Sequence, residues 1–192
     1  MKLRVLALCT AVVLAGCADL PARQRWSTQL QTLNTNLLSE ASATLTLERW
    51  CADHHLADPP RVFVRRLRDA DKPLPDELRA QLAIDAAEPI AYRHVQLVCG
   101  DHVLSEADNW YVPGRLTPAM NRQLETSDEP FGKVVKPLGF QRRTLSSRVL
   151  WASAQHPDMP RDLLRHTAVL YTSVQPFSAV IETYQRGLFD LP

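Results

Sequence analysis

Two charged side chains, Arg93 and Glu182, are candidates for chemistry because they fall where a buried sheet face would hold apolar residues. In the strand-like run AYRHVQLVC, Arg93 shares a face with Val95, since successive strand residues point to opposite sides. Glu182 shares a face with Val180 in the later run SAVIETY. An unpaired buried guanidinium is costly, so Arg93 requires either a fixed carboxylate or an anionic ligand.

The two charges leave two interpretations open. Arg93 and Glu182 either form a buried ion pair that only holds the sheet together, or they belong to an anion-binding pocket. In the second case Arg93 is the carboxylate clamp, because the planar guanidinium matches a carboxylate with two parallel hydrogen bonds.

Other reactive residue types give weaker patterns. Cys51, His54 and His55 lie close together but have no distant partner ligands, so no metal site is predicted. His94 falls on the strand face opposite Arg93 and is expected to be exposed or packed rather than catalytic. The sequence has no G-x-S-x-G elbow, so hydrolase chemistry has no support. The three basic residues of one later strand are expected to cover a solvated face, although one of them could reach a pocket: Arg142, Arg143 and Arg148.

The N-terminus predicts export and a lipid anchor. Lys2 and Arg4 precede an uncharged apolar run over 5–14, which is typical of a signal peptide and too short to span a bilayer. The following LAGC resembles a bacterial lipobox and implies cleavage after residue 16 and acylation of Cys17, with palmitate among the chains. Ala18 follows the cysteine, which favours the outer over the inner membrane, facing the periplasm. The alternative is a buried N-terminal helix that happens to contain LAGC.

Two cysteines, Cys51 and Cys99, remain in the expected mature chain, because Cys9 leaves with the signal peptide. Outside the cytosol they either form a disulfide or stay as separate buried thiols, and the sequence does not decide between these.

Composition and periodicity predict one α+β domain over 26–192, preceded by a signal peptide (1–16) and a lipidated tether (17–25). A net charge of +1 excludes the strongly basic surface of most nucleic-acid-binding proteins, and no nucleic-acid partner is expected. Apolar spacing predicts helices over 26–38, 44–54 and 75–84, and further helices starting near Pro118 and Pro130. About six strand-like runs accompany these helices, and this combination indicates an antiparallel sheet flanked by helices. The strand-like runs lie at 61–67, 91–99, 102–113, 141–151, 163–174 and 178–184.

The span from about residue 37 to 184 resembles chorismate lyase and its wider fold family, which includes effector-sensing domains of bacterial transcription regulators. The resemblance lies in LLSEASATLTLERW, PLPDELRAQL, the hairpin AYRHVQLVCGDHVLSEADNWYVP, the PFG helix start and the SAVIETY strand, in that order. It implies a buried ligand cavity under covering segments. It also implies chemistry without cofactor or metal, in which pyruvate is eliminated from chorismate to leave 4-hydroxybenzoate.

The resemblance assigns roles to four positions. Arg93 matches the arginine that grips the ring carboxylate, and Glu182 matches the glutamate near the hydroxyl end. Phe131 stands for the leucine of the family's Pro-Leu-Gly helix start, although a second PLG at 137–139 competes for that match. Asn109 occupies the position of a second family arginine, and this departure removes one carboxylate contact.

The expected function is therefore a membrane-anchored, chorismate lyase-like protein that binds a small aromatic or enolpyruvyl carboxylate and has the lyase reaction as one option. The alternatives are a non-catalytic ligand binder or sensor and a structural envelope lipoprotein. A monomer is the expected state.

Overall fold

The computed structural model describes residues 19–68, 71–85, 87–152, 154 and 158–189. The predicted signal peptide and Cys17 lie outside these residues. The described helices are α1 (Asp19–Ser39), α2 (Ala43–Asp53), α3 (Asp76–Leu82), α4 (Pro118–Thr126) and α5 (Phe131–Val134), with 3-10 turns η1 (Pro113–Arg115), η2 (Lys136–Leu138) and η3 (Arg186–Leu188). The strands are β1 (Val62–Leu67), β2 (Ala91–Cys99), β3 (His102–Tyr111), β4 (Gln141–Val149), β5 (Asp162–Tyr171) and β6 (Pro176–Gln185).

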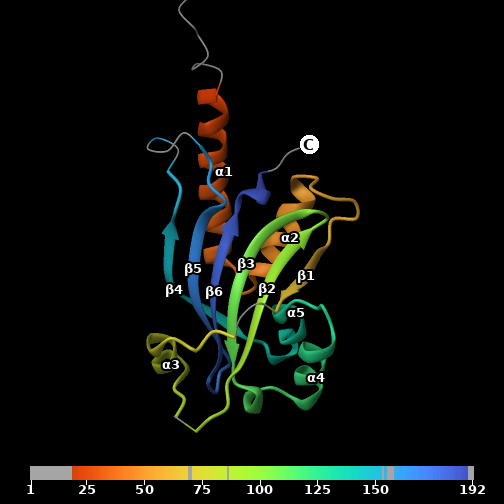
Figure 1. Cartoon of the computed structure of the whole chain (residues 1–192), viewed down its shortest axis with the longest axis vertical. Helices are drawn as coiled ribbons and strands as arrows, with labels where there is room; N and C mark the ends of the chain where they lie inside the picture. Colours follow the sequence, from red (N-terminus) through yellow and green to blue (C-terminus); the bar gives the residue numbers. More distant parts are fainter. Residues whose placement is uncertain (1–18, 69–70, 86, 153, 155–157, 190–192) are drawn as a thin grey trace, which may run out of the picture.

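The strands form one antiparallel sheet in the order β1-β2-β3-β6-β5-β4 (Figure 1). The predicted α+β fold with six strands is confirmed. Hairpins join β2 to β3 and β5 to β6, and the sheet is completed where β6 pairs with β3. Gly100 makes the first hairpin possible, because its φ of +56° favours glycine and an added Cβ would lie 2.9 Å from Ala57 Cβ.

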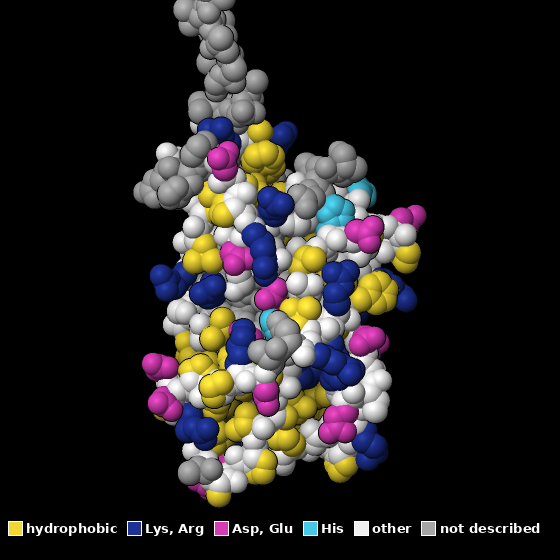
Figure 2. All heavy atoms as spheres, viewed as in Figure 1, with side chains coloured by type: hydrophobic (Ala, Val, Ile, Leu, Met, Phe, Trp, Pro, Cys, Tyr) yellow, Lys and Arg dark blue, Asp and Glu magenta, His cyan; other side chains and the backbone are white. Residues whose placement is uncertain are grey.

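The two faces of the sheet have different covers. Ala168 and Val180 belong to the core cluster beneath α1 and α2, which lie behind the sheet in Figure 1. Their chain neighbours Val169 and Ala179 face the other way and pack against α3. Because α3 covers only part of that second face, a polar part of it stays near solvent. Figure 2 shows acidic and basic side chains interspersed over the face in view, with hydrophobic side chains gathered in its lower half.

A disulfide joins α2 to the end of β2. Cys51 and Cys99 are bonded, are both fully buried and are separated by 48 residues along the chain. The structure therefore decides between the two alternatives that the sequence leaves open for these cysteines. The bond fixes α2 against the sheet, and the N-terminal end of α2 forms one wall of the cavity described below.

Two helix starts differ from the predicted positions. The helix α1 already includes 19–25, which the sequence assigns to a tether. Pro21 is compatible with the helix because it lies in the first turn, where backbone N–H groups have no acceptor within the helix. Pro130 caps α5 from outside instead of occupying its first helical position. No helix in the described part of the chain combines the length and apolar character needed to cross a bilayer.

Candidate functional site

A small cavity lies between the sheet and the N-terminal end of α2 and contains all four site residues predicted within the described chain. Its volume is about 60 Å³, several times the space one water needs, and this size suits a small ligand rather than a polymer. Arg93, Asn109, Phe131 and Glu182 line it, together with Arg142 and the start of α2. The apolar lining includes Val64, Val95, Leu97, Phe140, Leu170 and Val180.

Arg93 and Asn109 are direct neighbours across the β2–β3 ladder. Their Cα positions pair in register, so both side chains lie on the cavity face of the sheet. Each residue is only 6% exposed. Ser178 Oγ donates to Asn109 Oδ1 at 3.2 Å. The amide NH₂ of Asn109 is then the group that is available to donate hydrogen bonds to a ligand.

The guanidinium of Arg93 is buried without an acidic partner among the described residues. Its Nη2 donates to the Glu129 carbonyl at a long 3.4 Å, and its Nε is buried with no hydrogen-bond acceptor. Burial, reinforced by the nearby Arg66, lowers the pKa of Arg93 to about 10, so the side chain stays charged at neutral pH. Arg93 therefore places a positive charge at the cavity that has no direct ion pair among the described residues, although the nearby Asp128 partly offsets it. The Arg93–Glu182 ion pair considered from the sequence is not formed.

Glu182 is paired instead with Arg142, from β4 at the edge of the sheet. Arg142 Nη2 lies 2.5 Å from Glu182 Oε2, and the Tyr184 hydroxyl donates to the same oxygen at 2.9 Å. Burial lowers the pKa of Arg142, but Glu182 outweighs this effect and raises it above the ordinary value. Burial and Glu182 both raise the pKa of Tyr184. The carboxylate is thus held in one orientation by two donors.

Of the three basic residues expected to cover a solvated face, Arg142 is the one that reaches the cavity, an option that the sequence left open, and the other two are exposed. The Arg142 side chain is only 4% exposed, whereas Arg143 and Arg148 are exposed on the same strand. Alternation in QRRTLSSRV is too weak to separate them, because the strand is polar on both faces. Arg142 is the second residue of β4 and lies two positions after Phe140, which also lines the cavity.

Phe131 forms the aromatic wall of the cavity. Its ring lies 5.4 Å from that of Tyr111 and 6.3 Å from that of Phe177. The next residue, Gly132, allows α5 to approach α2 closely, since an added Cβ would lie 3.1 Å from Ser42 Oγ. Phe131 and Gly132 line the cavity, whereas the competing PLG at 137–139 is not part of its described lining.

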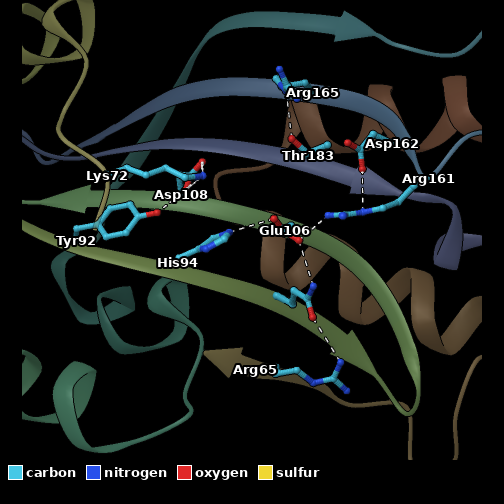
Figure 3. Close-up of polar contacts among 11 residues, drawn as sticks. Arg65, Lys72, Tyr92, His94, Glu106, Asp108, Arg161, Asp162, Arg165 and Thr183 are labelled. Atoms are coloured by element: carbon cyan, nitrogen blue, oxygen red, sulfur yellow. Dashed lines mark hydrogen bonds and ion pairs between the residues drawn. The ribbon is translucent and has the colours of Figure 1, made fainter. Parts of the chain in front are cut away.

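His94 lies on the opposite face of the sheet and takes part in a separate polar network (Figure 3). It is buried, and its Nε2 lies 3.0 Å from Glu106 Oε1. Gln96 and Arg161 donate to the other oxygen of Glu106. Burial raises the pKa of Glu106, but the hydrogen bonds from Gln96 and His94 and the charge of Arg161 outweigh it and lower the pKa. The network is separated from the cavity by the sheet itself.

A curated relative shows the family of the chain. The uncharacterized protein y4mC from Sinorhizobium fredii is 45% identical over 201 aligned positions, which cover 91% of this chain and 85% of the relative. The chain belongs to the y4mC family. No established family profile matches the chain.

The fold of the chain resembles that of solved bacterial effector domains. PhnF from Mycobacterium smegmatis superposes with a TM-score of 0.51 at 11% identity, over 88% of this chain and 85% of PhnF. The ligand-binding domain of a GntR-family regulator from Bordetella bronchiseptica has a TM-score of 0.48 at 21% identity, over 65% of this chain and 85% of that domain. Such effector domains share the chorismate lyase-like fold, so the predicted fold is confirmed. At these identities the likeness concerns the fold alone.

Proposed function

We propose that this protein is a lipid-anchored, periplasm-facing binding protein whose cavity takes a small aromatic or enolpyruvyl carboxylate. The observation that carries this proposal is Arg93, a buried guanidinium that lines the cavity without an acidic partner among the described residues. A carboxylate beside Arg93 would neutralise it and accept its unused hydrogen bonds. The neighbouring Asn109 amide would supply a further donor to the same group.

The remaining lining supports a ligand with an unsaturated body. Phe131, Phe140 and Leu170 give an apolar wall that suits a ring or an enol ether. The charged groups of the lining are Arg93, Arg142 and Glu182, which sum to one net positive charge. A ligand with one negative charge would leave the buried site neutral, whereas a second carboxylate would leave an unpaired negative charge.

Elimination of pyruvate from chorismate is a second candidate function, favoured by the presence of both Arg93 and Glu182 in one cavity. That reaction breaks the bond between the ring carbon and the enol ether oxygen and releases 4-hydroxybenzoate and pyruvate. It therefore needs a protein mainly to position the substrate and stabilise developing charge. Asn109 weakens this candidate, because chorismate has two carboxylates and the amide cannot supply a second positive charge.

Export receives independent support from the disulfide between Cys51 and Cys99, because such bonds persist in oxidising compartments and are rare in the cytosol. LAGC at 14–17 provides the proposed anchor, with the outer membrane favoured by Ala18. A monomer with no nucleic-acid partner completes the proposal.

The test is titration of the full chain, purified in mild detergent, with 4-hydroxybenzoate in a calorimeter. Arg93→Ala is expected to weaken binding about 10- to 100-fold, because a charge-assisted hydrogen bond is lost. Arg65→Ala is the matched control, since Arg65 is exposed on the edge strand β1 and contacts Gln96. A parallel incubation with chorismate, assayed for pyruvate, separates binding from turnover. If the folded chain neither binds nor turns over, the proposed function is wrong and the structural envelope alternative gains support.

A further inference from the structure

The helix α1 separates the proposed lipid anchor from the cavity. It starts at Asp19, two positions after Cys17, and ends at Ser39. The cavity lining begins two positions later, at Ala41. At a rise of 1.5 Å per residue α1 is about 30 Å long, so the helix sets a large distance between the anchor and the cavity.

The helix α1 is fixed against the sheet and therefore cannot act as a flexible tether. Three leucines at helical spacing are at most 2% exposed and belong to the main core: Leu30, Leu33 and Leu37. Asn34 Oδ1 accepts a hydrogen bond from Ser147 Oγ on β4 at 3.0 Å and lies 2.7 Å from His166 Nε2 on β5. The helix and the sheet thus form one packed unit.

The N-terminal turns of α1 extend past the start of β5. The contact between Asn34 and His166 places these residues at the same level, and both elements run downward side by side in Figure 1. From this level α1 continues back to Asp19, a rise of about 22 Å. The strand β5 continues back only to Asp162, which is about 13 Å. Roughly 10 Å of helix therefore stands beyond the beginning of the strand.

The cavity lies toward the opposite end of the molecule. Glu182 pairs in register with His166, and the lining residue Leu170 lies about 13 Å further down β5. The cavity is thus about 20–35 Å from the start of α1, measured along the helix. An outer hollow of about 260 Å³ shares Phe140 with the cavity and includes the exposed Lys136, so the cavity meets solvent at this end.

The charges near the start of α1 suit the headgroups of a bilayer. Arg23 and Arg25 lie in the second turn, and after Asp19 the helix contains no acidic residue. Gln24 and Arg25 are exposed. Positive side chains near the N-terminus of a helix do not favour its dipole, so these arginines are not explained by the stability of the helix. They do complement the phosphate groups of lipids.

We propose that α1 is a rigid spacer whose N-terminal turns contact phospholipid headgroups, so that the cavity is held away from the bilayer and opens toward the aqueous side. The inference rests on the proposed function, because lipid on Cys17 supplies the attachment. Only Ala18 lies between that cysteine and the helix, and one residue spans less than about 4 Å. The domain therefore has little freedom to turn its cavity toward the membrane.

A fluorophore attached to an introduced cysteine measures this orientation on the acylated full chain. Gln24→Cys places the label on α1 near the bilayer. Val174→Cys places it in the turn between β5 and β6, at the opposite end of the strand from Asp162, where Val174 is 84% exposed. The introduced thiol is the free one in the mature chain, because Cys17 is acylated and the two remaining cysteines form the disulfide.

The labelled chains are placed in vesicles of phosphatidylethanolamine and phosphatidylglycerol that contain lipids with a nitroxide on the headgroup, which quenches nearby fluorophores. Quenching at position 24 is expected to be at least about fivefold stronger than at position 174, because the length of α1 separates the two levels. Similar quenching at both positions would overturn the inference while the anchor stands. A chain that carries no lipid and does not bind the vesicles would overturn both.

An insertion directly before Asp19 tests whether the rigid helix is the cause of the orientation. About six residues of Gly-Ser sequence are expected to lower the quenching ratio between positions 24 and 174 at least about twofold, since such linkers are flexible. An insertion of about six alanines is the matched control, because alanine extends the helix and should preserve the ratio. An unchanged ratio with the Gly-Ser insertion would show that α1 does not set the orientation, and circular dichroism verifies that each chain is folded.

Discussion

At the scale of single residues, His166 connects the cavity network to the first helix. It is fully buried on β5, and its Cα pairs in register with that of Glu182 on β6. Its Nε2 lies 2.7 Å from Asn34 Oδ1 on α1, while its Nδ1 is buried with no partner. Burial lowers the pKa of His166 to about 4, although Glu182 opposes this effect. The ring is therefore neutral at the pH at which the protein is expected to work.

This histidine predicts a loss of stability in mild acid. The histidine of the unfolded chain takes up a proton near pH 6.5, whereas that of the folded chain does so only near pH 4. The stability associated with the neutral ring is therefore fully present above pH 6.5 and is lost as the pH falls toward 4. The free energy of unfolding is expected to be about 2 kcal/mol lower at pH 5 than at pH 7.5 from this group alone. Urea denaturation at the two pH values measures the difference.

The variant His166→Gln is expected to lose that part of the pH dependence, because glutamine keeps an N–H for Asn34 but does not titrate. His102→Gln is the control, since His102 lies in the hairpin at the start of β3 and is partly exposed. If His166→Gln keeps the full difference between pH 7.5 and pH 5, the acid sensitivity comes from other groups.

How far single site residues can be predicted depends on the regularity of their strands. Alternation in β2 and β6 is regular enough to mark Arg93 and Glu182 as misfits on a buried face, and both line the cavity. Their partners could not be predicted, because the length and flexibility of arginine let Arg142 reach across a whole strand. The sequence also gives no sign that Tyr184 and Arg142 both contact the same oxygen of Glu182.

At the scale of elements, the disulfide is the main covalent constraint on the cavity wall. It joins α2, whose N-terminal residues Ala43 and Thr44 line the cavity, to β2, which holds Arg93. The double variant Cys51→Ala/Cys99→Ala is expected to lower the free energy of unfolding by about 2–4 kcal/mol, because the unfolded chain gains the entropy of an open loop. Urea denaturation of both chains under non-reducing conditions measures this change.

Ligand affinity provides a second readout for the same variant. If the bond also holds α2 in place over the cavity, 4-hydroxybenzoate binding should weaken even under conditions where the variant is fully folded. Cys9→Ala is the matched control, because Cys9 lies in the expected signal peptide and contributes nothing to the mature domain. Unchanged stability in the double variant would mean that the disulfide makes no net contribution to the free energy of unfolding.

Element types were predictable from local patterns, whereas their arrangement was not. Each of the six strands coincides with an alternating or β-branched run, and the β2–β3 hairpin follows from Gly100-Asp101. The central pairing of β6 with β3 joins segments separated by more than 60 residues, as in Ser105 with Tyr184, so no local signal specifies it. The start of α1 was missed because 19–25 is polar and contains Pro21, although proline is tolerated in a first turn.

At the scale of the whole molecule, the proposed anchor determines which ligands the cavity can meet. Lipid on Cys17 would hold the domain at the membrane, two residues before the described start of α1. The charge of the chain adds no strong electrostatic attraction to the membrane beside the proposed lipid, because the net charge is only +1 and the face in Figure 2 mixes both signs. A binding protein in this place samples small carboxylates of the periplasm, whereas a chorismate-consuming enzyme would need its substrate exported.

The anchor predicts a specific covalent modification. When the full chain is expressed in a Gram-negative host, the product is expected to lack residues 1–16, to carry acyl chains on Cys17 and to stay with membranes after a high-salt wash, since several acyl chains hold a protein stably where one does not. Cys17→Ser is expected to carry no lipid and to keep the full-length mass, because the processing enzymes act on the acylated cysteine. Intact mass spectrometry of the membrane and soluble fractions measures both outcomes.

Cys9→Ser is the control and should be processed as the unmodified chain is. An unmodified N-terminus in the soluble fraction would instead favour the buried-helix alternative for LAGC, and the periplasmic part of the proposed function would be wrong even if Arg93 binds a carboxylate.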